Sequence, residues 1–394
     1  MSARRQRLVT PRFAVVTFAG LAYFVALGVV LPVLPHYVED ELHGGDVAVG
    51  IAVGAFALGA VLLRPWAGRL GDSIGRRALM VGGALIVGVS IAMYSLTSSL
   101  ASLSACRFLT GVGEAAFFVG AATTIADMAP VERRGEAVSY FSVAVYGGLA
   151  FGPVIGETVL DHSHFDRVWL TATVLALLAS VLGLAVVDPP RASVDVEHRH
   201  LLHRAALGPG TVLALGLVGL AGFTAFLPLY VTEIGLTQSR FVFLLYGTLI
   251  LAVRIVGARL PDVLGPIRAG TAALSAGGAG LLTMAAIPSL GGLLAGTVIF
   301  AAGMSLLFPA LLTLALTGIG EHERASVVGT FSTFFDLSQG TGALILGVVA
   351  ETAGYRGAFA AGGLLAFVGL VTLRTRVDAQ RSADPSALRS RNDP

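Results

Sequence analysis

Residues 64–77 read RPWAGRLGDSIGRR, and residues 254–267 read RIVGARLPDVLGPI. A shift of 190 maps charged and turn residues of the first stretch onto identical residues of the second: Arg64 onto Arg254, Asp72 onto Asp262 and Gly75 onto Gly265. Matches among arginine and aspartate are hard to attribute to chance in a chain whose common residues are small and apolar. The two stretches therefore indicate an internal repeat, and each of them joins two long apolar segments.

The composition is that of a membrane protein. Of 394 residues, 55% are hydrophobic and only 13% are charged, and a soluble domain of this length needs far more charge to stay in solution. Segments that are long enough to cross a bilayer, which takes about 20 apolar residues, recur along the chain. They lie at 13–38, 47–66, 78–97, 101–127, 136–160, 166–187, 211–232, 240–260, 268–287, 290–318, 325–350 and 356–373.

These segments and the repeat together predict the fold. We expect an all-α membrane protein of twelve transmembrane helices, arranged as two pseudo-symmetric six-helix bundles in parallel orientation. The prolines and charges of one internal segment mark a loop between the bundles, and the polar tail is predicted to be disordered. The predicted division is an N-terminus (1–12), a first bundle (13–187), a central loop (188–210), a second bundle (211–373) and a tail (374–394).

Arginine is concentrated on one side of the predicted membrane. All 26 basic residues are arginines, and most lie in the N-terminus, the central loop, the tail and the loops after the second, fourth and eighth spans. The opposite side holds only Arg167, Arg240 and Arg356. Because cytoplasmic loops carry an excess of basic residues, we expect a multi-pass protein of the cell membrane with both termini in the cytoplasm.

Several classes of protein are excluded or disfavoured by single residue types. The chain has no lysine. A P-loop and a Schiff-base enzyme both need a lysine, so both classes are excluded. The single cysteine, Cys106, excludes an internal disulfide and a cysteine-based metal site. His198, His200 and His203 are read as part of a solvated loop rather than as metal ligands. We expect no enzyme activity, cofactor, resident metal or nucleic-acid partner, and a monomer in the lipid bilayer.

Three motifs carry a family resemblance over about 13–373. Residues 68–77, GRLGDSIGRR, resemble the G-x-L-x-D-R-x-G-R-R/K signature of the major facilitator superfamily, with Ser73 in place of the family's arginine. Residues 107–116, RFLTGVGEAA, are similar to its R-x-x-x-G-x-G-x-A motif. Residues 148–156, GLAFGPVIG, are similar to the G-x-x-x-G-P-x-x-G motif of its antiporters, although Glu157 stands where a final glycine is expected.

The resemblance implies a role for the first of these motifs. In this family the first motif closes the cytoplasmic side in the outward-open state, together with an acid at the end of the fourth span. That role is implied for Gly68, Asp72, Gly75, Arg76, Arg77, Asp127 and the repeat-related Asp262. The alternative is that the arginines only set the topology.

The third motif places small residues on one stripe of a helix. Gly148, Gly152 and Gly156 allow a second helix to approach closely, and Pro153 can bend the span. The resemblance implies that this bend favours antiport, whereas helix packing alone is the structural alternative.

Charged residues inside predicted spans are candidates for function, because a charge at mid-bilayer costs roughly 2.5–3.5 kcal/mol. Arg107 and Glu114 are seven residues apart and share one face of the fourth span, and Asp336 lies midway along the eleventh. The resemblance implies a part in proton coupling for Arg107, and a carboxylate in apolar surroundings suits a proton carrier. The alternative for Glu114 is a structural ion pair with Arg107. Glu157, near the outer end of its span, is expected to be solvated.

Aromatic and amide side chains recur on spans that could line a central cavity. The candidates are Tyr23, Phe118, Tyr146, Phe226, Phe335 and Gln339. An aromatic cavity that also holds acids suits amphipathic or cationic organic substrates, although most of these residues are expected to serve helix packing.

We therefore predict a secondary active transporter of small organic solutes that works by alternating access, with protons as the coupling ion and export as its direction. One alternative is a sugar or metabolite facilitator or symporter on the same fold. A second is a membrane sensor that does not transport. The repeat is also asymmetric, because a shift of 190 maps Arg107 onto Thr297 and Glu114 onto Met304. Proton chemistry is therefore expected in the first half, together with Asp336.

Overall fold

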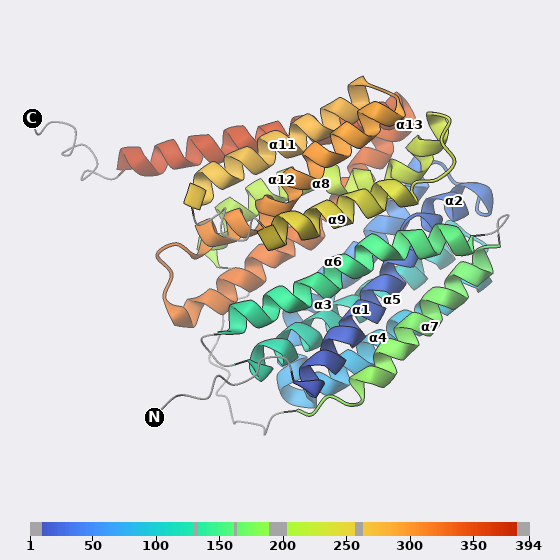
Figure 1. Cartoon of the computed structure of the whole chain (residues 1–394), viewed down its shortest axis with the longest axis horizontal. Coiled ribbons are helices and arrows are strands. Elements are labelled where there is room, and N and C mark those ends of the chain that lie inside the picture. The colour runs from blue at the N-terminus through green and yellow to red at the C-terminus, as the bar shows by residue number, and fades with distance from the viewer. Residues whose placement is uncertain (1–9, 130–132, 161–163, 189–202, 257–262, 384–394) are drawn as a thin grey trace, which may run out of the picture.

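The computed structural model of the chain describes residues 10–129, 133–160, 164–188, 203–256 and 263–383, and Figure 1 shows their arrangement. Within these ranges every regular element is a helix and there is no strand. The first half contains α1 (Pro11–Val30), α2 (Val33–Asp40), α3 (Asp46–Ile74), α4 (Arg76–Ala92), η1 (Met93–Leu96), α5 (Leu100–Met128), α6 (Arg134–Val159) and α7 (Phe165–Gly183). The second half contains α8 (Arg204–Glu233), α9 (Arg240–Val256), α11 (Pro266–Ala286), α12 (Leu290–Leu316) and α13 (Glu321–Ala383).

The helices account for the predicted twelve crossings. Ten described stretches are long and apolar enough to span a bilayer, and α1 and α2 together form the first of them. The last stretch, within α13, is interrupted at Gly354, whose φ of 73° and ψ of 173° are not helical, so α13 crosses twice. The twelfth crossing is α9, which has 17 described residues. The predicted all-α fold is confirmed.

Two predicted boundaries are wrong. Helix α8 begins at Arg204, so 204–210 belongs to a helix rather than to the central loop. The Nδ1 atom of His203 accepts a hydrogen bond from the amide of Ala205 and caps this helix, and Gly210 packs against the ring of Phe334. The second error lies in the tail, because α13 continues to Ala383.

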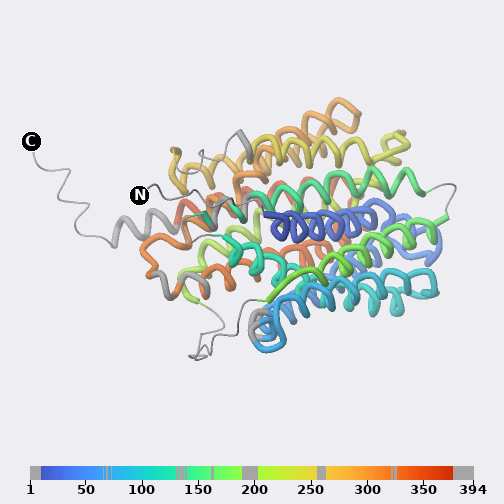
Figure 2. The backbone as a smooth tube through the Cα atoms, turned by 60° about the horizontal axis from the view of Figure 1, so that its bottom comes forward, coloured from blue at the N-terminus to red at the C-terminus, as the bar shows by residue number. Residues whose placement is uncertain are grey.

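The described helices bury two apolar cores: one joins residues of the first half with a few from α8 and α13, and the other lies in the second half. Close approach of small residues builds the helix contacts around them. A Cβ atom on Gly83 of α4 would lie 2.6 Å from the carbonyl oxygen of Gly113 on α5, so only glycine lets these two helices pack at this distance. The halves meet along two seams, where α3 packs against α13 and α6 packs against α9. Figure 1 shows α6 and α9 side by side, and Figure 2 shows the helices running along a common direction.

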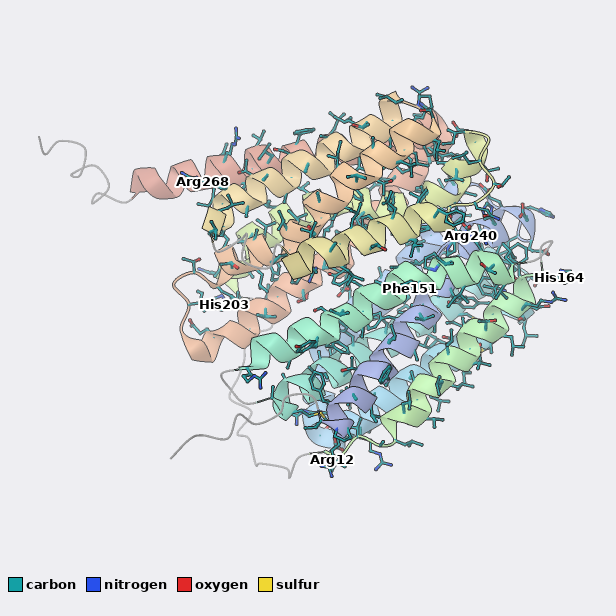
Figure 3. All side chains as sticks on the ribbon, in the orientation of Figure 1. Arg12, Phe151, His164, His203, Arg240 and Arg268 are labelled. Carbon is teal, nitrogen blue, oxygen red and sulfur yellow. The ribbon has the colours of Figure 1, made fainter. Side chains whose placement is uncertain are left out.

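The bundle has two chemically distinct ends. We call the end where α1 begins and α13 finishes the terminus end, and the opposite end, where α6 finishes and α9 begins, the far end. In Figure 3, Arg12, His203 and Arg268 mark the terminus end, and His164 and Arg240 mark the far end. The seams run between these two ends, so residues on them can report or control the relative position of the halves.

Candidate functional site

A buried group of three charges joins the two halves near the middle of the α3–α13 seam. Arg64 of α3 donates from Nη2 to Oε2 of Glu114 on α5 at 2.8 Å, and its Nε lies 2.8 Å from Oδ2 of Asp336 on α13. The side chains of Arg64, Glu114 and Asp336 are only 15%, 11% and 9% exposed. We call these three residues the charge triad.

The two contacts of Arg64 differ in quality. The contact to Glu114 is a hydrogen-bonded ion pair, whereas the Arg64 Nε and Asp336 Oδ2 atoms are close but not aligned for a hydrogen bond. The guanidinium also lies 5.1 Å from the centre of the Phe118 ring. Two carboxylates face one guanidinium, so the triad carries one uncompensated negative charge when both acids are ionised. A single proton neutralises it.

Arg107 does not belong to this group. Its Nε donates to the carbonyl oxygen of Ala52 at 3.2 Å, its Nη1 lies 3.5 Å from the hydroxyl of Tyr94, and its guanidinium covers the Phe56 ring at 4.7 Å. The alternative of an ion pair between Arg107 and Glu114 is therefore wrong. Arg107 contacts α3 at Ala52, which lies about 18 Å along the helix from Arg64, at about 1.5 Å per residue. The two arginines therefore lie at different depths in the bundle.

Arg64 is the residue of the charge triad that the sequence did not single out. Its place at the end of a predicted span made it read as part of a loop motif. A usable signal was present, because Arg64 and its repeat mate Arg254 are both arginines at the edge of apolar runs, where an unpaired charge is costly.

Arg254 occupies the second seam. From α9 it donates to the hydroxyl of Tyr146 on α6 at 2.7 Å, and its guanidinium lies 4.2 Å from the centre of the same ring. Among the described residues, no acidic side chain forms an ion pair with Arg254. The structure thus places the predicted cavity residue Tyr146 against an arginine of the other half.

The other predicted cavity residues are mostly enclosed by packing. Tyr23 is fully buried with its ring stacked on Phe117 at 3.8 Å, and its hydroxyl has no hydrogen-bond partner. Phe226 is fully buried and stacks on Tyr355, and Phe335 packs edge-on against Phe308. The Nε2 atom of Gln339 is buried without a hydrogen-bond partner. Tyr23 and Phe226 are therefore core residues in this state of the protein.

At the terminus end, the first motif forms a turn with two polar contacts. Gly75, at a φ of 100°, separates α3 from α4, a conformation that favours glycine. Arg76 Nη1 lies 2.7 Å from Asp127 Oδ2, and the amide of Arg77 donates to Oδ1 of Asp188 at 2.9 Å. Neither contact reaches the second half: Asp127 lies in α5, and Asp188 lies in the segment that follows α7. Gly68 lies within α3. The side chain of Asp72 and the whole of Asp262 lie outside the described residues.

The glycine motif of α6 packs against α1. A Cβ atom on Gly28 of α1 would lie 2.8 Å from the carbonyl oxygen of Gly148 and 3.0 Å from the Cα of Gly152. Gly156 similarly meets the backbone of Val29, and Pro153 lies inside α6. These residues therefore set the distance between α1 and α6, as the packing alternative requires.

Two carboxylates bridge the halves at the far end. Glu157, at the end of α6, accepts hydrogen bonds from the amides of Ser239 and Arg240 at 3.0 and 2.9 Å, and from the Ser239 hydroxyl. Glu351 of α13 accepts a hydrogen bond from the amide of Val47 in the first turn of α3 at 3.1 Å. The expectation that Glu157 is merely solvated is therefore wrong.

These two contacts, which we call the far-end clasps, are related by the repeat. A shift of 194 relates Glu157 to Glu351, and a shift of 193 relates Val47 to Arg240. In each clasp a carboxylate of one half meets the N-terminus of a helix in the other half, where free amides and the helix dipole favour negative charge. The clasps hold the halves together on the far side, at the ends of both seams.

Comparisons with known proteins agree with this architecture. The chain is 31% identical over 356 residues to an uncharacterized MFS-type transporter of Salmonella typhimurium, covering 88% of this chain and 91% of that protein. The fold of the present chain is similar to that of the human organic anion transporter MFSD10 in its crystal structure. The TM-score is 0.72, and the identity is 19% over 93% of this chain and 100% of that one.

A second structural neighbour is the nucleoside transporter NupG, with a TM-score of 0.75 and 12% identity over 93% of this chain and 99% of that chain. At such low sequence identities, the likeness to both neighbours shows the fold and not the substrate. The model of the Major Facilitator Superfamily matches residues 16–343. Together with the two seams and the repeat, this match shows that the chain is a multi-pass membrane protein that belongs to the Major Facilitator Superfamily.

Proposed function

We propose that the protein is a proton-coupled secondary transporter that exports small organic solutes by alternating access. Its family and its relatives support membrane transport. The arginine bias supports a cell-membrane location with the terminus end, and both termini, in the cytoplasm.

The charge triad is the observation that carries the proton coupling. Asp336 and Glu114 belong to different halves and share one guanidinium, that of Arg64. A proton that binds Asp336 removes the attraction across the α3–α13 seam and leaves Arg64 paired with Glu114 alone. Protonation therefore changes the force between the halves, which is what coupling a proton to alternating access requires.

The far-end clasps supply the other part of the cycle. With both clasps formed, the far end is closed. A transporter that opens to the far side must break both carboxylate–helix contacts and make others at the terminus end, where the Arg76–Asp127 pair lies. The glycine and proline motif of α6 supports export, since its family resemblance is to antiporters.

The proposal is tested with purified protein in liposomes. A panel of radiolabelled or fluorescent organic anions, cations and neutral solutes is offered while a pH gradient is imposed, and again after a protonophore has collapsed it. Gradient-dependent flux of at least one solute is expected. Flux that ignores the gradient, for every solute that moves, would remove the proton coupling from the proposal.

A further inference from the structure

The repeat relates the charge triad to the surroundings of Arg254. The shift of 190 that maps Arg64 onto Arg254 also maps Phe118 onto Phe308. The two acids of the triad have different counterparts: Glu114 maps onto Met304, and Tyr146 maps onto Asp336. Both pairs across the seams are therefore repeat-related, Arg64 with Asp336 and Arg254 with Tyr146.

The two arginines consequently differ in charge balance. Arg64 has two carboxylates at 2.8 Å. The residues that the repeat relates to the two acids are Tyr146, a phenol that contacts Arg254, and Met304, a thioether; neither carries a negative charge. The Tyr146 hydroxyl takes one hydrogen bond, and the ring face gives a cation–π contact of 4.2 Å. These contacts hold the guanidinium in place but leave its charge uncompensated among the described residues.

The donors of Arg254 are also incompletely used. Its Nε atom is enclosed and has no hydrogen-bond partner. A buried donor without a partner costs about 1–3 kcal/mol, and more on a charged group. A guanidinium presents its donors in a planar fork that matches a carboxylate or another oxyanion, so an anionic group is the partner that satisfies both the charge and the geometry.

We propose that Arg254, positioned by Tyr146, binds the anionic group of the transported solute, and that the substrate is an organic anion with a carboxylate, sulfonate or phosphate. This inference rests on the proposed transport function and names its substrate class. Of the amphipathic or cationic substrates expected from the sequence, it disfavours the cationic ones, because the acids that would bind a cation are already paired with Arg64.

The site lies where such a ligand affects the transport cycle. Arg254 belongs to the second half and Tyr146 to the first. An anion that takes over the donors of Arg254 changes the contact across the α6–α9 seam, as a proton on Asp336 changes the contact across the α3–α13 seam. Substrate and proton thereby act on two repeat-related contacts between the same two halves.

The test uses three probes that share one ring system and differ in charge: 1-naphthoate, 1-naphthamide and 1-naphthylmethylamine. Binding to the full-length protein in uncharged detergent is measured by the ligand-dependent shift in Tm. Naphthoate is expected to bind at least about 10-fold more tightly than the amide, as a charged hydrogen-bonded contact implies, and the amine is expected not to bind.

Two variants assign the binding to Arg254. Arg254→Gln is expected to lose the preference for naphthoate over the amide. Tyr146→Asp gives Arg254 the carboxylate that Arg64 receives from Asp336, so this variant keeps the charge compensated in the folded state and is also expected to lose the preference. Arg268→Gln, which removes an exposed arginine at the start of α11, serves as the matched control and retains it.

The outcomes are separable from those of the proposed function. Equal binding of the three probes, no binding of naphthoate, or an unchanged preference in both Arg254→Gln and Tyr146→Asp overturns the anion site. If gradient-driven flux of some other solute persists in liposomes, proton-coupled transport stands and only the substrate class is wrong. If no solute responds to the gradient while naphthoate still binds through Arg254, the coupling fails and the anion site remains.

Discussion

At the scale of single residues, the protein keeps three charges inside the membrane by making them partners of one another. Arg64 is held by Glu114 within the first half and by Asp336 across the seam. Removing one member of a buried ionic group leaves an uncompensated charge, which is far more damaging than the net contribution of the intact group suggests. The triad is therefore both a structural requirement and a group that a proton can alter.

Arg64 is the only cation of the charge triad. Arg64→Gln leaves Glu114 and Asp336 buried without a cation and is expected to lower the free energy of unfolding by about 3–5 kcal/mol. Lowering the pH should restore part of this loss, because a carboxylate that is buried without a cation is destabilising only in its charged form. Thermal unfolding in detergent at pH 8 and pH 5 measures both effects.

Arg268→Gln is the control for this prediction, because it removes an exposed arginine and should change neither quantity. The triad would lose its structural importance if Arg64→Gln unfolded at the wild-type temperature at both pH values.

At the scale of helices, glycine stripes set the distances on which the seams depend. A Cβ atom on Gly152 would lie 2.8 Å from the carbonyl oxygen of Val25 and 2.6 Å from the carbonyl carbon of Gly28, both in the backbone of α1. Backbone atoms in a helix cannot move aside individually, so α1 and α6 have to separate to accept a side chain.

A matched pair of substitutions tests this packing. Gly152→Ala is expected to lower the free energy of unfolding by about 1–3 kcal/mol, the usual cost of overpacking. Gly147→Ala, on the same helix, meets only the Leu21 side chain at 3.7 Å and should be neutral or slightly stabilising. Equal effects of the two substitutions in thermal unfolding would contradict the close approach of α1 and α6.

The far-end clasps give a prediction about helix termini. Replacing Glu157 and Glu351 together by glutamine removes two charges from helix N-termini, each of which contributes about 0.7 kcal/mol. The closed far end should therefore be disfavoured about tenfold. Ala343, which is buried against Gly50 on the α3–α13 seam, reports this opening when it is replaced by cysteine in a Cys106→Ser background.

Maleimide labelling of the Ala343→Cys variant should accelerate about tenfold in the double glutamine variant. Glu41→Gln, at an exposed acid near the far end, should leave the labelling rate unchanged. If the double variant were labelled no faster than its parent, the clasps would have no part in keeping the far end closed.

At the scale of the whole molecule, the periodic features were predictable and the pairings were not. Apolar runs and a repeat offset of 190 located the twelve crossings because burial in lipid constrains every residue of a span. The helical part of 188–210 was missed, since its Gly and Pro residues look like a linker until the packing of Gly210 on Phe334 is seen.

The candidate site was predictable in its residue types but not in its partners. Glu114 and Asp336 stood out because charges are rare inside spans. The pairing of Arg64 with Asp336 depends on how α3 and α13 are aligned along the seam. No local sequence pattern determines that alignment. The clasp at Glu157 was missed for the same reason, because its partner helix begins more than eighty residues later in the chain, at Arg240.

Under the proposed function, protonation of the charge triad drives transport. The most direct test compares net accumulation with exchange in liposomes containing the Asp336→Asn variant, which keeps the shape of the side chain and cannot take up or release a proton. Accumulation driven by a pH gradient should fall at least about 10-fold, whereas exchange of solute at equal concentrations on both sides should stay within about threefold of wild type. Gradient-driven accumulation at the wild-type rate in Asp336→Asn would contradict the claim.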